Sequence, residues 1–494
     1  MNKSVKKEEL APLQPSRMDT VKKFLFDNKV IVLFVVLCLI CLLIADTTLN
    51  YVASEVLSRF GRNTCLVLAL IIPCLAGLGM NFGIVVGAIA AQISIFWIVH
   101  WGFTGITGFL LCVLMSTPLA IFFGYLLGKL FNNTKGAEMI AGLVLGFFAD
   151  GLYRLFVLYI MGGVIPYDDP NLLDRGFGLR NAFDLTGNLK YALDDISFLT
   201  VMALLFGVMI LSVLITSLFK AKKGQEVDKK QCLTRLLLAA AGLVVSIVLR
   251  FIPFFNTMLG GPRLKMMDAL MLVGITGVVW AVYKMAARKD QPHTKTFVIL
   301  ALSVIAIVLK FIPPVANQFV FVQLSSSSYA VICLICFFNN WILNTKLGQD
   351  MRTVGQNRSV ATSAGINVNR IRIIATCIST VLAAWGQLIF LQNLGTFNTV
   401  QQQTNVGLYA VAAILVGGAN VQKATNKQAI IGVFLFHTMF VLAPLAATRI
   451  VGDSAISEYI RMFFSYGVIA VSLAMHAWKK AVRPKKEDAE KSDK

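Results

Sequence analysis

Long runs of apolar residues alternate along this chain with short polar segments. Most of the runs have the roughly 20 residues that a helix needs to cross the hydrocarbon core of a bilayer. Because the runs are continuous and not alternating, helices are expected and barrel strands are not. The pattern predicts an all-α, polytopic integral membrane protein with about 12–14 transmembrane helices. The candidate spans lie near 30–49, 62–80, 81–98, 103–130, 138–162, 197–219, 235–255, 267–284, 296–317, 329–345, 370–392, 407–417, 427–448 and 461–478.

Two of these regions do not fit a continuous spanning helix. Residues 77–87 read GLGMNFGIVVG, with four glycines around Asn81 and no room for a loop outside the membrane. The run 407–418 holds too few apolar residues to cross alone. Broken helices are therefore predicted near both segments, and non-helical backbone at membrane depth is typical of a solute path. Close packing of helices through glycine is the alternative interpretation, and both stay open at this point.

Composition and charge support this fold and orient it. Apolar residues make up 57% of the 494 residues, charged residues 14%, and the mean hydropathy is +0.74. The net charge of +20 lies mostly in segments that flank the spans, so we attribute it to membrane topology and to anionic membrane lipid, and no nucleic acid is expected. The basic tails 1–29 and 479–494 are expected in the cytoplasm. The aspartate-rich loop 163–196 is expected on the outer side of a transmembrane domain covering 30–478.

An internal repeat is visible in the middle of the chain. The segments 247–255 (IVLRFIPFF) and 307–315 (IVLKFIPPV) share one pattern. Each has a cation, Arg250 or Lys310, before an Ile-Pro step that should kink the helix. Residues 235–328 are therefore predicted to contain extra helices made by tandem duplication. The two cations are expected to extend to the outer membrane interface.

Residues with catalytic chemistry are sparse. Asp150 and Arg154 lie four residues apart, so they can neutralise each other on one helix face, and a packing role and a substrate-contact role are both open. The four histidines are scattered. The segment GYLLGKL at 124–130 has the wrong glycine spacing for a phosphate loop and no Ser or Thr after its lysine. The chain is therefore not expected to be an enzyme or to hold a metal or cofactor of its own.

The polar and basic stretch 346–370 lies between two strongly apolar runs and has clear helix punctuation. A helix of two turns is unstable alone, so it must rest on another surface. A groove on a soluble partner and the anionic headgroups of the membrane are the two candidates. The basic residues that place the stretch at the cytoplasmic face are Lys346, Arg352, Arg358, Arg370 and Arg372. The predicted caps are Gly355 as a left-handed C-cap, Asn357 as the N-cap of a short helix over 358–364, Gly365 as its C-cap, and Asn367 or Asn369 as the N-cap of the next span.

The same stretch, TKLGQDMRTVGQNRSVATSAGINVNRIR from Thr345 to Arg372, resembles the cytoplasmic signature of permease subunits of ATP-binding-cassette importers. The group concerned is that of ribose, simple-sugar, nucleoside and branched-chain amino acid permeases. NFGIVVG at 81–87 and AAILVGGAN at 412–420 are similar to further motifs of this group. The matching positions of the signature are Gly348, Arg352, Val354, Gly355, Asn357, Ala361, Gly365, Ile366, Asn367 and Val368.

The resemblance implies a multi-pass permease subunit in a bacterial inner membrane, with both termini in the cytoplasm. Its segment 355–368 would dock on separate ATPase subunits, which hold the ATP and Mg²⁺. A second permease, identical or homologous, would complete the pore, and an extracytoplasmic binding protein would deliver a sugar- or nucleoside-like solute. The residues implied in ATPase coupling are Arg352, Gly355, Asn357, Ala361, Gly365, Ile366, Asn367 and Val368. The candidates for the translocation path are Asn81, Gly83, Gly87, Asn340, Gln387, Asn405, Gly417 and Gly418.

The main alternative is a secondary transporter driven by an ion gradient, since broken helices also serve that class. It would need a buried carboxylate that is free to bind a proton or sodium. Glu138 lies near a helix end, Asp46 near the outer boundary, and Asp150 already has Arg154. A membrane enzyme acting on lipid is a third hypothesis, and the sequence offers it no acid/base cluster.

Overall fold

The computed structural model describes residues 28–464 except 135, 161–163, 165–171, 175–179, 223–228, 288–293, 401, 454 and 457, and it also describes 466–467 and 470. The predicted cytoplasmic tails, most of the final span 461–478 and part of the outer loop 163–196 lie outside the described residues. In the first part of the chain the helices are α2 (Lys29–Ile44), α3 (Leu49–Leu68), α4 (Ile71–Leu75), α5 (Ile84–His100), α6 (Gly105–Asn133) and α7 (Glu138–Leu155), which continues as the π-helical turn η1 (Phe156–Ile160). The middle part contains α8 (Phe198–Lys222), α9 (Lys229–Phe251), α10 (Pro253–Leu259), α11 (Met266–Ala287), α12 (Thr294–Phe311) and α13 (Pro313–Gln318). The last part contains α14 (Ser326–Leu343), α15 (Lys346–Gln356), α16 (Arg358–Ser363), α17 (Val368–Leu394), α18 (Gln402–Val416) and α19 (Asn426–Val451).

Most of these helices have the length and composition of membrane spans. Among the described residues, nine helices are long and apolar enough to cross a bilayer, and three shorter apolar helices, Lys29–Ile44, Ile84–His100 and Thr296–Phe311, accompany them. Twelve apolar helices agree with the predicted 12–14. The prediction of an all-α, polytopic membrane protein is confirmed.

Helix α3 begins earlier than the sequence indicated. The predicted span started near residue 62, whereas the helix starts at Leu49. Its first turns carry charged side chains that have partners within the protein. Arg59 pairs with Glu55 at 3.1 Å, and its guanidinium lies 5.3 Å from the centre of the Phe440 ring. An average of hydropathy cannot recognise a helix whose polar side chains are satisfied by neighbouring helices.

The first predicted helix break is confirmed. Helix α4 ends at Leu75, residues 76–83 form turns, and α5 begins at Ile84. Gly77 and Gly79 have φ values of +74° and +73°, in the left-handed region that side chains with a Cβ avoid.

The second short run folds as a regular helix that stops early. Helix α18 is continuous from Gln402 to Val416 and ends at Gly417 and Gly418, the latter with a φ of +81°. The chain then turns and starts α19 at Asn426. A 15-residue helix of about 22 Å does not cross the bilayer by itself.

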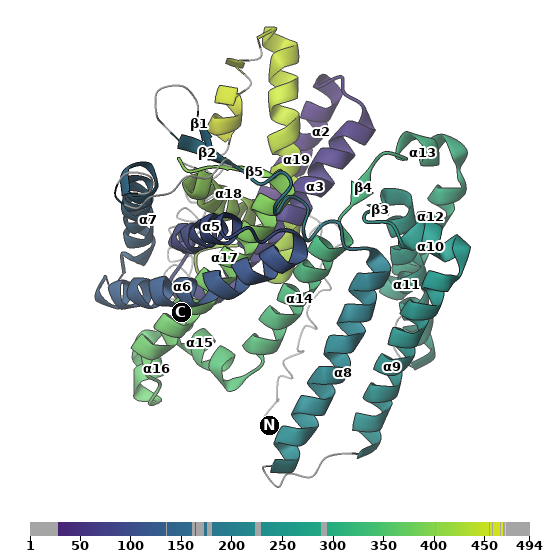
Figure 1. Ribbon diagram of the computed structural model, residues 1–494, viewed down its shortest axis with the longest axis horizontal. Helices are drawn as coiled ribbons and strands as arrows, with labels where there is room; N and C mark the ends of the chain where they lie inside the picture. Colours follow the sequence, from purple (N-terminus) through teal and green to yellow (C-terminus); the bar gives the residue numbers. More distant parts are fainter. Residues whose placement is uncertain are drawn as a thin grey trace, which may run out of the picture.

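Helix α17 lies at the centre of the molecule and packs against α3, α5 and α6 (Figure 1). Small residues on its neighbours allow this close approach. A Cβ on Gly128 of α6 would lie 2.8 Å from the Cα of Ile373, and a Cβ on Gly87 of α5 would overlap the carbonyl oxygen of Thr380. Glycine at these positions therefore serves helix packing.

Helices α8–α13 form a group on one side of the molecule (Figure 1). The predicted kinks are present: Ile252 and Ile312 have extended backbone, with φ values of −88° and −90°, and the following proline starts a new helix. The two copies meet through an antiparallel pair of short strands, β3 (Leu264–Lys265) and β4 (Gln323–Leu324). The two cations of the repeat differ. Arg250 is exposed and donates to the hydroxyl group of Thr200, whereas Lys310 reaches the carboxylate of Asp268 on α11 at 2.8 Å.

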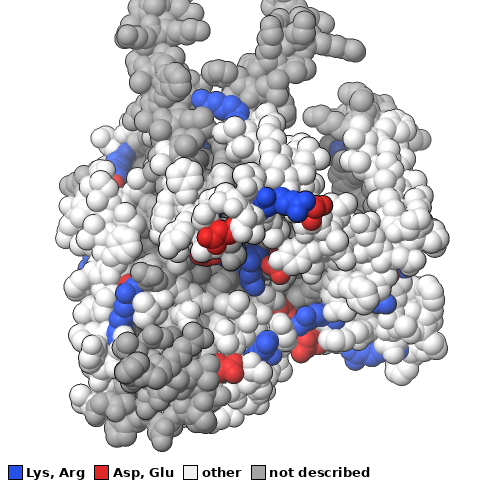
Figure 2. Space-filling model, turned by 90° about the horizontal axis from the view of Figure 1, so that it is seen from above, with Lys and Arg blue, Asp and Glu red and all other residues white. Residues whose placement is uncertain are grey.

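One end of the molecule carries a small sheet of the strands β1 (Leu172–Asp174), β2 (Arg180–Asp184) and β5 (Thr396–Asn398). Figure 2 views the molecule from this end and shows acidic and basic side chains side by side on a mostly uncharged surface. Ion pairs such as Arg263–Asp195 at 3.8 Å are present in the structure. Helices α15 and α16 lie at the opposite end (Figure 1).

Candidate functional site

The polar stretch 346–370 folds into two short helices whose caps are local. The side chain of Asn357 accepts hydrogen bonds from the backbone N–H groups of Ser359, at 2.9 Å, and Val360, at 3.2 Å. These bonds satisfy two of the donors that a helix start leaves free. Gly365 has a φ of +76°, and Asn367 caps α17 by accepting from Arg370 N–H at 3.0 Å. The predicted short helix, its N-cap and its C-terminal glycine are confirmed.

The prediction of a left-handed C-cap at Gly355 is wrong. Gly355 lies within α15 and is not among the residues with a positive φ. Its importance is steric: a Cβ at this position would overlap the carbonyl oxygen of Leu75, and a Cβ on Gly77 would lie 2.8 Å from the Cα of Gly355. The backbone of α15 thus touches the first helix break directly, through two glycines.

A cavity of about 350 Å³ lies where the short helices meet the two interrupted regions of the chain. The Sγ atom of Cys74, at the end of α4, lies 3.3 Å from the carbonyl oxygen of Asn420, which belongs to the connection after α18. The predicted coupling segment, residues 346–370, therefore contacts the first helix break and shares this cavity with the connection after α18. The lining residues are Gly77, Leu78, Gly79, Gly136, Glu138, Met139, Val354, Gly355, Gln356, Arg358, Val421 and Gln422.

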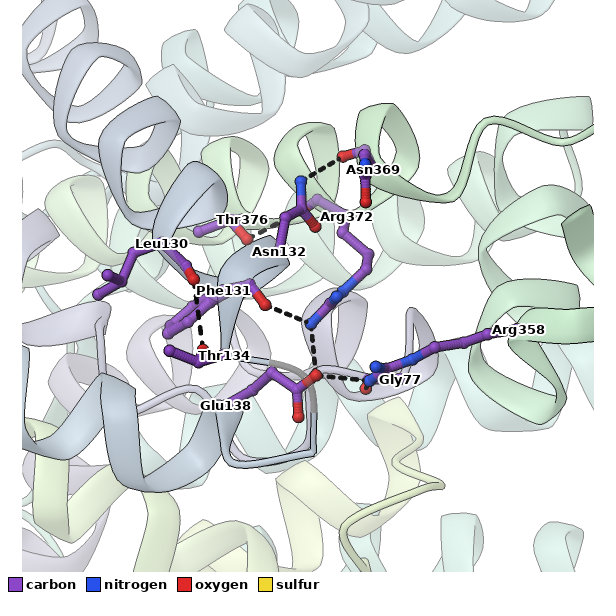
Figure 3. A network of polar contacts seen from close by, with 10 residues as sticks. All are labelled: Gly77, Leu130, Phe131, Asn132, Thr134, Glu138, Arg358, Asn369, Arg372 and Thr376. Carbon is purple, nitrogen blue, oxygen red and sulfur yellow. Dashed lines mark hydrogen bonds and ion pairs between the residues drawn. The ribbon is translucent and has the colours of Figure 1, made fainter.

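An ion network joins α16 to the membrane helices (Figure 3). Glu138, the first residue of α7, accepts hydrogen bonds at 2.6 Å from both Arg358 and Arg372. Arg372 also donates to the carbonyl oxygen of Phe131 on α6 at 3.0 Å, and Arg358 donates to that of Gly77 at 3.3 Å. One carboxylate thus connects α7 to α16 and α17, while the two arginines extend the network to α6 and to the first break.

The sequence did not single out this network. Arg372 was expected with the basic residues of the cytoplasmic face, but its side chain is only 2% exposed. Glu138 was considered only as a carboxylate near a helix end. The pairing connects residues more than 200 positions apart, so no local pattern could have found it.

The outward side of the coupling segment is exposed. Val360 is 56% exposed, whereas the adjacent Ala361 is fully buried. Helix α16 therefore turns Ala361 toward the rest of the protein and presents a small apolar spot, Val360, among polar residues. The exposed residues of this surface are Arg352, Gln356, Asn357, Ser359, Val360, Thr362, Ser363, Ala364, Gly365, Asn367, Asn369 and Arg370. Ile366 and Val368 are half-buried.

The candidates for the translocation path do not share one environment. Asn81 is bound within the first break, where it accepts from Gly83 N–H at 2.9 Å and donates to Ser379 at 3.3 Å. A Cβ on Gly83 would lie only 2.5 Å from Cδ2 of Leu127 on α6. This glycine, like Gly87, therefore lies at a close contact between helices. Gln387 of α17 is fully buried, with no described partner for either amide atom.

The remaining candidates lie elsewhere. Asn340 of α14 is exposed and accepts from Asn426 at 3.2 Å. Asn405 is half-buried on α18. Gly417 allows α18 to approach α19, because a Cβ there would overlap the carbonyl oxygen of Gln428, while Gly418 ends α18. Their assignment to the solute path stays a prediction.

Comparison with known proteins bears on this site. The family model described as the branched-chain amino acid transport system / permease component matches residues 196–473, more than half of the chain. The chain belongs to this family. The matched region contains α8–α19, and therefore the whole coupling segment with its caps. No solved structure matches the chain.

Two curated relatives are similar over a part of their length. The chain is 32% identical over 118 residues to the autoinducer 2 import system permease protein LsrC of Klebsiella pneumoniae subsp. pneumoniae, covering 23% of this chain and 33% of that protein. It is 36% identical over 109 residues to the protein of the same name from an Enterobacter species, covering 22% of this chain and 30% of that protein. The chain thus spans about a third of the length of the curated relatives it matches.

Proposed function

We propose that this multi-pass membrane protein is the permease subunit of an ATP-binding-cassette importer for a small, polar, sugar- or nucleoside-like solute. The family description as a permease component and the import function named in both relatives support this proposal. In this arrangement the chain lies in a bacterial inner membrane with both termini in the cytoplasm. A second permease subunit completes the pore, an extracytoplasmic binding protein delivers the solute, and partner subunits hydrolyse ATP with Mg²⁺.

The observation that carries the proposal is the position of α16. It is a capped, two-sided helix, seated inward by Ala361 and exposed outward at Val360, and it begins beside the first helix break. A small apolar spot with a polar and cationic rim fits a groove on a soluble partner. A displacement of α16 by an ATPase pair would be transmitted to the interrupted helices through Gly355 and Arg358.

A gradient-driven carrier is less well supported. Among the described residues, the acidic side chains that are buried are Glu138, Asp150, Asp194 and Asp268. Each has partners: Glu138 two arginines, Asp150 Arg154, Asp268 Lys310, and Asp194 the side chains of Ser328 at 2.7 Å and Asn393 at 2.6 Å. Three of these carboxylates are neutralised by a cation and the fourth is held by two hydrogen bonds, and a carboxylate occupied in this way is a poor carrier of a proton or sodium ion.

The test replaces Val360 by aspartate and measures the ATPase activity that co-purifies with the tagged chain from its native membranes. Because Val360 is exposed, the variant should keep its fold. A charged aspartate cannot replace the apolar contact that Val360 would make in the groove of the ATPase subunit, so the co-purifying ATPase activity should fall at least tenfold. Val320→Asp is the matched control, since Val320 is 39% exposed and lies near the opposite end of the molecule. Transport by the purified chain alone, driven by an ion gradient in proteoliposomes, would refute the proposal.

A further inference from the structure

A polar cluster lies among apolar residues where α5, α7 and α18 meet. The carboxylate of Asp150 on α7 accepts hydrogen bonds from the guanidinium of Arg154 and from the side-chain amide of Gln403 on α18. Gln92 of α5 donates from Nε2 to Oε1 of Gln403 at 3.5 Å. Asp150 is 4% exposed, and both glutamines are fully buried. These side chains come from positions far apart in the sequence and converge on one place.

Asp150 and Gln92 lie near the middle of their membrane-spanning helices, and Gln403 reaches them from the first turn of α18. Asp150 is twelve residues after the start of α7 at Glu138, which corresponds to about 18 Å along the helix. Gln92 is the ninth of the 17 residues of α5. Charged and polar side chains at this depth are costly and are typical of solute or ion pathways.

The cluster is not self-sufficient in hydrogen bonds. Three buried atoms in or beside it have no partner among the described residues: Oε1 of Gln92, Nε of Arg154 and the hydroxyl oxygen of Tyr153. Buried polar groups of a purely structural network are normally satisfied. Here an acceptor, a donor and a hydroxyl group, which can do both, remain free around a carboxylate and a guanidinium.

We propose that Asp150, Arg154, Gln92 and Gln403 form the site at which the permease contacts its solute midway across the membrane, and that this solute is neutral and rich in hydroxyl groups. The ion pair has no net charge, so it does not attract an ion of either sign. Each hydroxyl group donates and accepts at once, which matches free donors and acceptors lying side by side. This inference rests on the proposed function.

Asp150, Gln92 and Gln403 are enclosed in this conformation, while Arg154 is 31% exposed, so a solute reaches the carboxylate only when α7 and α18 separate. A small cavity already lies between α5, α7 and α18, beside Gly146 and Thr404, which adjoin the cluster along their helices. On α7 the buried positions Glu138, Gly142, Gly146 and Asp150 recur every four residues and form one stripe. Because Glu138 binds Arg358 of α16, movement of the coupling segment is transmitted along this stripe to Asp150.

The experiment measures uptake of ¹⁴C-labelled D-ribose, D-xylose and adenosine by cells that express the complete importer. Asp150→Asn should lower uptake of the accepted solute at least tenfold. Asp268→Asn is the matched control, because Asp268 is also a buried aspartate paired with a cation, but it lies in the α8–α13 group. Uptake by D268N should stay within twofold of the unaltered protein, at equal amounts of protein in the membrane.

Gln92→Leu separates a binding role from a folding role. It removes a carbonyl that has no partner, together with the 3.5 Å hydrogen bond that Nε2 donates to Gln403, so the resistance of the protein to unfolding should fall only slightly. The KM for the accepted solute should nevertheless rise at least fivefold. An unchanged KM in Q92L, an equal loss in D150N and D268N, or no uptake of any of the three solutes by the unaltered importer would overturn the inference. Uptake that is lost in D150N but continues without ATP would support the site and refute the proposed function.

Discussion

Replacing Glu138 by glutamine removes the negative charge on which Arg358 and Arg372 converge. The glutamine has nearly the same volume, so the packing at the start of α7 is kept and the change is mainly electrostatic. Both guanidinium groups lie 2.6 Å from the same carboxylate oxygen. The variant therefore tests what one carboxylate contributes to the joint between α16, α17 and α7.

The expected cost follows from the burial of the partners. The side chains of Glu138 and Arg372 are 7% and 2% exposed, so the substitution leaves the charge of Arg372 buried with only neutral acceptors near it, the glutamine carbonyl and the carbonyl oxygen of Phe131. Leaving one charge of a buried pair unpaired costs about 3–5 kcal/mol. Arg358 is 36% exposed and is hydrated when unpaired, so Arg358→Gln should cost no more than about 1 kcal/mol.

The assay is unfolding of the purified chain in mixed micelles with increasing sodium dodecyl sulfate, followed by circular dichroism. E138Q should reduce the folded-to-unfolded ratio by about 10²–10⁴, and R358Q by less than about tenfold. The double variant E138L/R372M should regain most of the stability, because apolar residues replace a buried pair without leaving a charge. Equal destabilisation by E138Q and R358Q, or a cost of E138Q below about 1 kcal/mol, would refute this account of the network.

Three substitutions in the coupling segment should have graded effects in the same titration. Gly355→Ala should be the most severe, at about 2–3 kcal/mol with loss of uptake, because its Cβ would overlap the carbonyl oxygen of Leu75; wild-type stability would contradict the close contact. Gly365→Ala should cost about 1 kcal/mol, since its φ of +76° strains alanine while the surrounding space is open, and Gly365→Asn should cost less. Asn357→Ala should cost about 1 kcal/mol through two lost capping bonds, and retention of full co-purifying ATPase activity in this variant would show that the cap is not needed for docking.

The sequence predicted those features that depend on neighbouring residues. The caps at Asn357 and Asn367 and the left-handed Gly365 follow from local backbone chemistry, and the Ile-Pro steps follow from the geometry of proline. The class of fold followed from the length of apolar runs, since the bilayer leaves few alternatives.

The features that the sequence missed depend on contacts between distant segments. Gly355 was assigned a left-handed conformation, but it is needed because Leu75 approaches it, and nothing in the residues around 355 shows this. The partner of Asp150 on α18 is Gln403, which lies 253 positions away. The polar first turns of α3 likewise look unsuited to a membrane until their neighbours are known.

The place where α8–α13 join the rest of the chain has a consequence for topology. The hydroxyl groups of Ser327 and Ser328 bind the backbone of Leu193 at 2.5 Å and the side chain of Asp194 at 2.7 Å, so the chain leaves and returns at nearly one point. An inserted segment such as α8–α13 that begins and ends on the same side of the membrane must cross the membrane an even number of times. Duplication of one pair of helices, which the repeated Ile-Pro units indicate, is the smallest insertion that keeps the number of membrane crossings even. Such growth keeps every later helix in its original direction, and α16 stays on the face where a motor subunit can reach it.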